Sequence, residues 1–204
     1  MIKAILILSC IAHTVCGFTD CLLSYGKKGR LDLKAIKDPV KMREMFGDVP
    51  LWQPLVSIIV GTFAITIFTF GYLALSQWMN GYNTVLSAVM LIAAILFTVP
   101  IVTHHIICGL VEWFYIRLGR TDEVREAVLE FQTKTISTMF VGYLGLLVFT
   151  GCLFAAVVTG QTGLPRWACI FNTLPVMLLL SPTKLPAKGN IAGAVMFLGL
   201  AVMI

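Results

Sequence analysis

The chain has 204 residues and a formal charge of +5, and it is 58% hydrophobic but only 12% charged, with a mean hydropathy of +0.92. Soluble domains are about half apolar and about a quarter charged, so this composition excludes an ordinary soluble fold and predicts a membrane protein. The basic residues are scattered in loops between apolar runs, unlike the clustered patch of a nucleic-acid-binding module. We therefore expect membrane lipids, and no nucleic acid, among its partners.

Six apolar segments follow one another along the chain, and each is judged against the roughly 20 residues that cross a bilayer as a helix. They predict an all-α fold, a polytopic membrane helix bundle that forms one transmembrane domain over residues 1–204. The last two segments are short. The six expected helices cover about residues 2–25, 53–79, 84–116, 136–159, 165–181 and 190–204.

The first segment has a competing interpretation. Lys3 precedes an apolar stretch, which is also typical of a secretory signal peptide. The apolar run continues to Tyr25, however, and it contains no convincing small-residue cleavage site. We therefore predict that this segment is retained as a helix.

The loops indicate the orientation, because lysine and arginine accumulate on the cytoplasmic side of membrane proteins. If the N-terminus is outside, the three loops predicted to be inside contain 13 of the 15 basic residues. We therefore predict a multi-pass protein of the cell membrane with both termini outside and a cytoplasmic loop over residues 26–50. The 13 residues are Lys27, Lys28, Arg30, Lys34, Lys37, Lys41, Arg43, Arg117, Arg120, Arg125, Lys134, Lys184 and Lys188.

The stretch "DPVKMREMFG" in the first cytoplasmic loop predicts a short helix. Asp38 can cap it, Pro39 fits its first position, and Gly47 fits just beyond its end. Met42, Met45 and Phe46 would lie on the membrane while Lys41 and Arg43 meet lipid phosphates, which makes the helix interfacial. An ordinary solvated connector is the alternative.

The stretch "TDEVREAVLEFQ" predicts a second helix start. Thr121 can cap this helix, and Asp122 and Glu123 suit the positive end of its dipole. We expect the helix to continue into the fourth segment as a cytoplasmic extension.

Polar side chains interrupt the third segment, and they share one side of the predicted helix. With successive residues about 100° apart and His104 as the origin, Cys108 falls at about 40° and Glu112 at about 80°. His105 falls at about 100° on the same scale, so these residues form one stripe.

The first segment repeats this pattern, because His13 and Asp20 are only about 20° apart in angle. Ionisable groups at membrane depth cost several kcal/mol unless they are paired or wetted, so they normally face the bundle interior. We therefore expect the two stripes to face each other. His105 should meet a partner from the first segment, and His104 should lie toward the other edge.

These stripes predict a polar pocket that opens to the cytoplasm or the inner leaflet. Asn190 could add a further neutral wall. In the alternative interpretation the histidines and asparagines are interhelical or helix-end hydrogen bonders, and Glu112 is a surface carboxylate. The predicted pocket residues are His13, Asp20, His104, His105, Glu112 and Asn172.

The residue types suggest a metal site, but their spacing does not. Adjacent histidines on a helix point about 100° apart and cannot clasp one ion as an i, i+4 pair does. The chain contains no phosphate-binding loop, nucleophile elbow or dinucleotide fingerprint. We therefore predict no metal and no cofactor. Acid–base chemistry by histidine and a carboxylate remains chemically available.

Three stretches carry a resemblance to a known family. They are "CGFTDCLLSYGKKG", "GLVEWFYIRLGRTDEVREAVLEFQ" and "LPAKGNIAGAVMFLGL". They resemble a family of small six-helix bacterial membrane proteins catalogued as a domain of unknown function. The resemblance covers most of the chain and implies this architecture, and it implies no role for any individual residue.

Three functions follow as hypotheses. The leading one is a membrane protein whose polar pocket binds, and by extension transports, a small or amphiphilic ligand. The first alternative is an intramembrane enzyme that acts on a lipid-like substrate by acid–base chemistry, and the second is a structural or accessory subunit. Assembly as a homo-oligomer is left open.

Overall fold

The computed structural model describes residues 1–26, 29–31 and 35–204. These residues form an all-α fold of eight α-helices, with two 3-10 helices and one two-residue antiparallel ladder in which Tyr25 pairs with Arg30. Three basic residues used to predict the orientation, Lys27, Lys28 and Lys34, lie outside the described residues. The elements are α1 (Ile2–Ser24), β1 (Tyr25–Gly26), β2 (Gly29–Arg30), η1 (Ala35–Lys37), α2 (Pro39–Phe46), α3 (Trp52–Met79), α4 (Thr84–Arg117), α5 (Asp122–Thr135), α6 (Ser137–Val158), η2 (Arg166–Phe171), α7 (Thr173–Leu180) and α8 (Lys188–Met203).

Four helices are long and apolar enough to cross a membrane: α1, α3, α4 and the nearly continuous helix formed by α5 and α6. The bounds of α1, α3, α4 and α6 differ from the predicted ones by at most one residue at either end. The predicted extension is also confirmed, because Thr121 caps α5 by accepting from the Val124 N–H and α5 leads into α6 at Ile136. Apolar length was therefore a reliable guide to these four elements.

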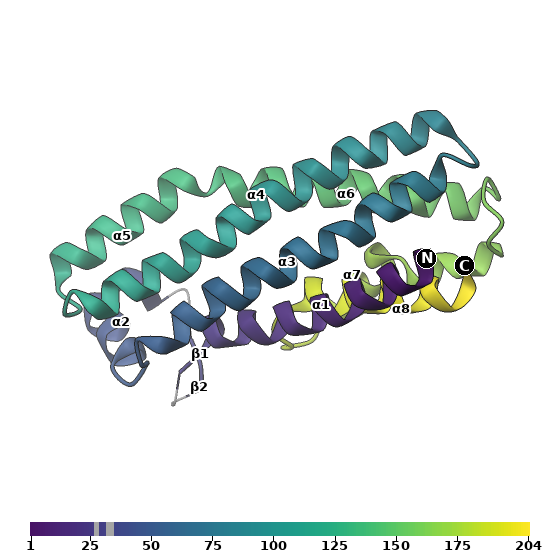
Figure 1. The fold of residues 1–204 in the computed structure, drawn as a ribbon. Coiled ribbons are helices and arrows are strands. Elements are labelled where there is room, and N and C mark those ends of the chain that lie inside the picture. Colours follow the sequence, from purple (N-terminus) through teal and green to yellow (C-terminus); the bar gives the residue numbers. More distant parts are fainter. Residues whose placement is uncertain (27–28, 32–34) are drawn as a thin grey trace.

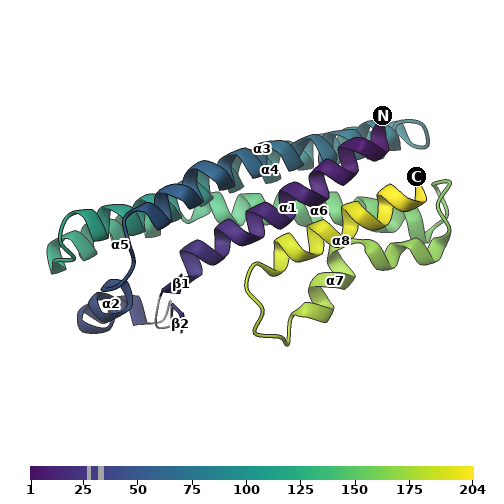
Figure 2. The ribbon, with the colours of Figure 1, turned by 60° about the horizontal axis from the view of Figure 1, so that its bottom comes forward.

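The helices form a ring. α1 packs between α3 and α8, α4 packs between α3 and α6, and η2 with α7 closes the ring between α6 and α8. Figure 1 shows both chain termini at one end of the molecule, which we call the terminal end, and α2 at the opposite end, which we call the α2 end. Figure 2 shows α7 and α8 beside the α1 side of the bundle.

The fifth predicted helix is not continuous. Residues 165–181 form the 3-10 helix η2, an extended Asn172 and the short helix α7. Asparagine competes for backbone hydrogen bonds and favours caps over helix interiors, and the Asn172 Oδ1 accepts from the Leu174 N–H at 2.9 Å. Its Nδ2 donates to the Thr150 carbonyl of α6 at 2.9 Å. The Asn172 side chain therefore caps α7 and also links the break in the helix to α6.

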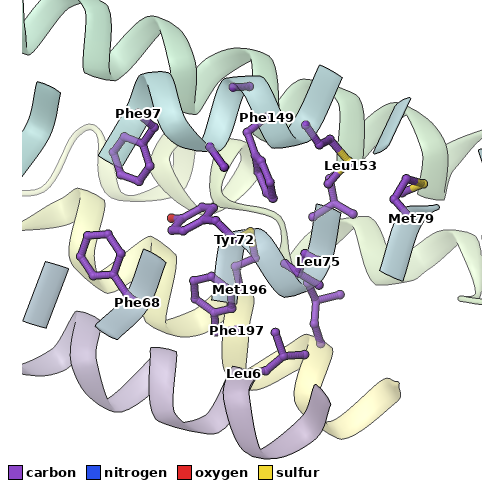
Figure 3. Close-up of a cluster of buried hydrophobic side chains, with 14 of the residues drawn as sticks. Leu6, Phe68, Tyr72, Leu75, Met79, Phe97, Phe149, Leu153, Met196 and Phe197 are labelled. Carbon is purple, nitrogen blue, oxygen red and sulfur yellow. The ribbon is translucent and has the colours of Figure 1, made fainter. Parts of the chain in front are cut away.

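An aromatic core fills the ring toward the terminal end. Tyr72 of α3 lies at its centre (Figure 3), with the rings of Phe97, Phe149 and Phe197 at 5.1, 5.0 and 5.0 Å in edge-to-face geometry. These three rings come from α4, α6 and α8. Edge-to-face pairs add stabilisation beyond their buried area, so this cluster joins helices from all sides of the ring.

The short helix α2 begins and ends as predicted, with Pro39 at its first position and Gly47 at its C-cap. Asp38 accepts from the Val40 and Lys41 N–H groups at 3.0 and 3.2 Å.

The predicted contact of this helix with the membrane is wrong. Met42 and Phe46 are 2% and 3% exposed, and they pack against the second half of α4. The Phe46 ring meets Tyr115 edge-on at 5.6 Å. Protein covers the apolar face of α2 because α4 extends far enough to offer its own apolar side chains.

Candidate functional site

Two lines of hydrogen bonds converge on Asp20 of α1. One reaches it from His105 of α4, and the other reaches it from His13 through Asn190 of α8. The structure therefore joins three of the predicted pocket residues, and the expected contact of His105 with the first helix is present. The site lies where α1 packs against α3 and α8.

The His105 ring is held between two acceptors. Its Nδ1 lies 3.3 Å from the Asp20 Oδ1, and its Nε2 lies 3.0 Å from the Ser57 carbonyl oxygen. A neutral imidazole has one donor and one acceptor nitrogen, whereas a protonated one donates from both. Because a carbonyl can only accept, Nε2 carries a proton. The Nδ1 that faces the Asp20 carboxylate can then donate to it only when the ring carries a second proton.

The second line has a fixed direction. The Asn190 Nδ2 donates to the Asp20 Oδ2 at 2.7 Å, which leaves the Asn190 Oδ1 to accept from the His13 Nδ1 at 2.9 Å. The His13 Nε2 is then an acceptor, and the Tyr72 hydroxyl donates to it at 3.3 Å. Every donor in this second line points toward Asp20.

The exposure of these groups differs. The side chain of Asp20 is 33% exposed, whereas that of His105 is 7% exposed. His13 is 2% exposed and stacks on Phe68 with 3.9 Å between ring centroids and 2° between ring planes. A neutral imidazole suits this aromatic environment. Asp20 is therefore the most exposed of these three side chains.

Two glycines make room for the imidazole rings. A Cβ atom on Gly61 of α3 would lie 2.0 Å from the His105 Nε2, and one on Gly193 of α8 would lie 2.6 Å from the His13 ring. Real contacts of a Cβ atom are essentially never this short. The backbones of α3 and α8 therefore form walls of the site. The imidazole rings can approach these backbones so closely only because glycine has no side chain.

The order Ser57, His105 and Asp20 resembles a hydrolase triad, but its protons run in the wrong direction. In a triad the histidine accepts a proton from the serine. Here the Ser57 hydroxyl donates to the Thr19 carbonyl at 2.9 Å, and its oxygen lies 3.4 Å from the His105 Nε2, which already carries a proton. Ser57 is also 0% exposed. The geometry therefore does not support a serine nucleophile.

His104 faces away from Asp20. Its Nδ1 lies 3.3 Å from the Thr138 hydroxyl of α6, and its Nε2 lies 3.5 Å from the Cys108 thiol. Thr138 donates to the Thr135 carbonyl, so its oxygen is free to accept from His104. Both ring nitrogens have neutral partners, and His104 serves as a link between α4 and α6.

The remaining predicted residues lie apart from the network. Glu112 is buried, and among the described residues its Oε2 has no hydrogen-bond partner. Asn172 uses its amide to cap α7 and to contact α6. Neither contacts Asp20 among the hydrogen bonds of the described residues.

Two hollows on the surface of the described residues are lined by apolar side chains. One of about 240 Å³ lies beside Trp167 and Phe171, and one of about 360 Å³ lies between α4 and α5. Neither includes a predicted site residue. The described residues also contain no group of three or more His, Cys, Asp or Glu side chains that could hold a metal ion.

Sequence reasoning did not predict Ser57 and Tyr72 as partners of the site. Both lie in a long apolar segment, where a single hydroxyl group does not mark one side of the helix as polar. Asn190 was expected only as a neutral wall, yet it bridges His13 and Asp20. Its position at the start of the last apolar segment was the signal available for it.

Residues 1–204 match the family described as a family of unknown function, DUF6796. The chain belongs to this family. No curated protein and no solved structure matches the chain. Membership in DUF6796 confirms the resemblance to a family of unknown function, and it assigns no role to Asp20 or its neighbours.

Proposed function

We propose that this protein is a multi-pass protein of the cell membrane that binds a small or amphiphilic ligand at Asp20 and transports it. The observation that carries the proposal is the partly exposed Asp20 carboxylate, which two hydrogen-bonding lines hold within an apolar helix. Ionisable groups at membrane depth are costly and usually mark ligand or ion pathways.

The proposal includes six crossings in one transmembrane domain. The termini lie at one end (Figure 1), so the number of crossings is even. η2 and α7 together rise about 24 Å, and α8 rises a similar distance, against a hydrocarbon thickness of about 30 Å. The Arg30 side chain, just after α1, donates to the Lys184 carbonyl in the turn between α7 and α8. This contact supports a broken fifth crossing that reaches the level at which α1 ends.

The proposed orientation has both termini outside and residues 26–50 in the cytoplasm. Arg43, Arg120 and Arg125 gather where α2 meets α4 and α5, as the positive-inside rule requires of a cytoplasmic end. A cysteine that replaces Ile36 should react with an impermeant reagent only after the cells are opened. Reaction in intact cells would reverse the orientation.

Lipids are the proposed partners of the outer helix faces. Large apolar side chains such as Phe63, Ile92 and Leu144 are more than half exposed, and their burial by lipid tails would remove them from water. Assembly as a homo-oligomer stays a prediction.

A ligand screen tests the proposed function. The melting temperature of the purified wild type is measured with a set of small and amphiphilic compounds, next to Asp20→Asn and the control His104→Gln. A ligand of this site should stabilise the wild type and His104→Gln but not Asp20→Asn. If all stabilising compounds act equally on Asp20→Asn, the binding site lies elsewhere.

A further inference from the structure

We propose that the Asp20 site takes a lipophilic organic cation and that binding of the cation releases the proton that His105 shares with Asp20. This inference rests on the proposed function, because it names a ligand class for the same site. Three features carry it: the accessible group, the source of its countercharge, and the surroundings.

The accessible ionisable group of the site is its carboxylate. His105 has both ring nitrogens engaged and is buried, whereas Asp20 is one-third exposed. A carboxylate offers about four lone-pair positions and donates nothing when ionised. Asn190 and His105 each use one position. A donor that reaches this site therefore meets a carboxylate with free lone-pair positions, and a cationic donor forms the stronger interaction with it.

The countercharge of Asp20 is removable. Among the described residues, His105 is the only basic side chain within salt-bridge distance of Asp20. A lysine or arginine would remain charged and would compete with a ligand cation at neutral pH. An imidazole can give up its proton in the physiological range. The positive charge opposite Asp20 can therefore leave as a proton when another cation arrives.

The surroundings favour a cation with an apolar body. Tyr143 of α6 lies close enough to Asp20 to be affected by its charge and is 51% exposed, and α1 is apolar enough to lie within a membrane. A small hydrated ion would lose its water shell there without enough oxygen ligands to replace it. A delocalised or alkylated cation loses less hydration and gains apolar contact.

The other ionisable groups facing this region do not supply a fixed positive charge at Asp20. His104 is turned to α6, and His13 reaches Asp20 only through Asn190. Arg30 lies toward the end of α1 and donates to the Lys184 carbonyl. The titratable groups near enough to interact with Asp20 or its neighbours are Cys16, Cys21, Cys108, Glu112 and Tyr143.

The exchange conserves charge. In the free protein the Asp20 carboxylate faces a doubly protonated His105. On binding, the carboxylate pairs with the incoming cation, the His105 Nδ1 gives its proton to water, and Nε2 keeps its bond to the Ser57 carbonyl. One cation enters for one proton released. The affinity for the cation should therefore rise about tenfold per pH unit while the free protein holds that proton.

The experiment uses the full chain in phosphatidylcholine nanodiscs and three probes of similar shape. They are radiolabelled tetraphenylphosphonium as the cation, tetraphenylborate as the anion and triphenylphosphine oxide as the neutral compound. Binding is measured between about pH 5 and 8, where an imidazole titrates, and corrected with empty nanodiscs. Proton release is measured with pyranine in weak buffer. Size-exclusion profiles and melting temperatures establish that each variant is folded.

We expect tetraphenylphosphonium to bind the wild type with about tenfold gain in affinity per pH unit and release of one proton. Asp20→Asn should lose this binding. His105→Gln should still bind the cation, without pH dependence and without proton release. The matched control His104→Gln should behave as the wild type.

Three results would overturn the inference. The first is cation binding to the wild type without proton release, and the second is unchanged pH dependence in His105→Gln. The third is Asp20-dependent binding of only the neutral or anionic probe, which would leave the proposed function intact with another ligand class. If no probe binds in an Asp20-dependent way, the cation inference fails, and the ligand screen decides separately on the proposed function.

Discussion

The two histidines that the lines of hydrogen bonds join to Asp20 occupy opposite kinds of environment. His13 lies in a closed aromatic box, stacked on Phe68 and 5.5 Å from the Phe197 ring. His105 lies between a backbone carbonyl and a carboxylate that is partly exposed. His13 is therefore confined by aromatic packing on one side of Asp20, whereas His105 is held by hydrogen bonds on the other.

Loss of the shared centre should produce the largest effect. Asp20→Ala leaves the His105 Nδ1 and the Asn190 Nδ2 without acceptors, and breaking a buried ion pair costs about 3–5 kcal/mol. We expect the lower end of this range because Asp20 is partly exposed. Thermal unfolding in detergent measures it, and Asp20→Asn should lose less because one acceptor oxygen remains. Equal stability of Asp20→Ala and the wild type would remove Asp20 from the centre of the network.

Replacing the two glycines that face the imidazole rings should show which of the two regions adapts to an added methyl group. Gly193→Ala places a Cβ against the stacked His13 ring, and Gly61→Ala places one against His105. Overpacking costs about 1–3 kcal/mol, and we expect Gly193→Ala to be the more destabilising because aromatic rings confine His13. Thermal unfolding compares both variants.

Gly151→Ala is the matched control for these variants, since no described atom outside its own stretch of α6 lies within 4 Å of its added Cβ. Alanine is the better helix former by about 1 kcal/mol, so the control should be neutral or stabilising. If Gly61→Ala is as harmless as the control, the His105 side is more open than the structure indicates.

Removal of the Tyr72 hydroxyl should have a smaller effect on the region around His13. Tyr72→Phe leaves the His13 Nε2 without its donor, and one lost hydrogen bond typically costs about 1 kcal/mol. Because the two groups are coupled, the double variant His13→Phe with Tyr72→Phe should cost less than the sum of the single changes. Urea or thermal unfolding of the four proteins gives this coupling. Simple additivity would show that the hydroxyl and the ring do not interact.

The Asp38 carboxylate, which lies outside the bundle, should give the smallest effect on stability and serves as a reference for Asp20. The Lys41 N–H, together with the Val40 N–H and the Lys41 charge, holds the pKa of Asp38 below its usual range. A depressed pKa contributes stability above the ordinary carboxyl pKa of about 4, and that stability is lost as the pH falls through the lowered value. The protection of the α2 amides against hydrogen exchange, corrected for the intrinsic pH dependence of amide exchange, should therefore fall on acidification below about pH 4.

Asp38→Asn is the matched variant for this test, because asparagine also caps helices but does not titrate. In this variant the cap does not titrate, so the protection of the α2 amides should not fall on acidification below about pH 4. The interpretation is wrong if acid loosens α2 equally in both proteins.

The sequence alone determined the bounds of the four long helices, the caps at Asp38 and Thr121, and the side of the third predicted helix on which His105 lies. These features depend on apolar length, local backbone geometry and helical angle, which neighbouring residues fix. Tertiary structure alone decided that Asn190 bridges to Asp20, that His104 turns to Thr138, and that α2 packs on α4. Each depends on contacts between residues far apart in the chain, which no local pattern encodes. The break at Asn172 belongs to both, because the capping preference is local but the Thr150 carbonyl that satisfies its amide is supplied by α6.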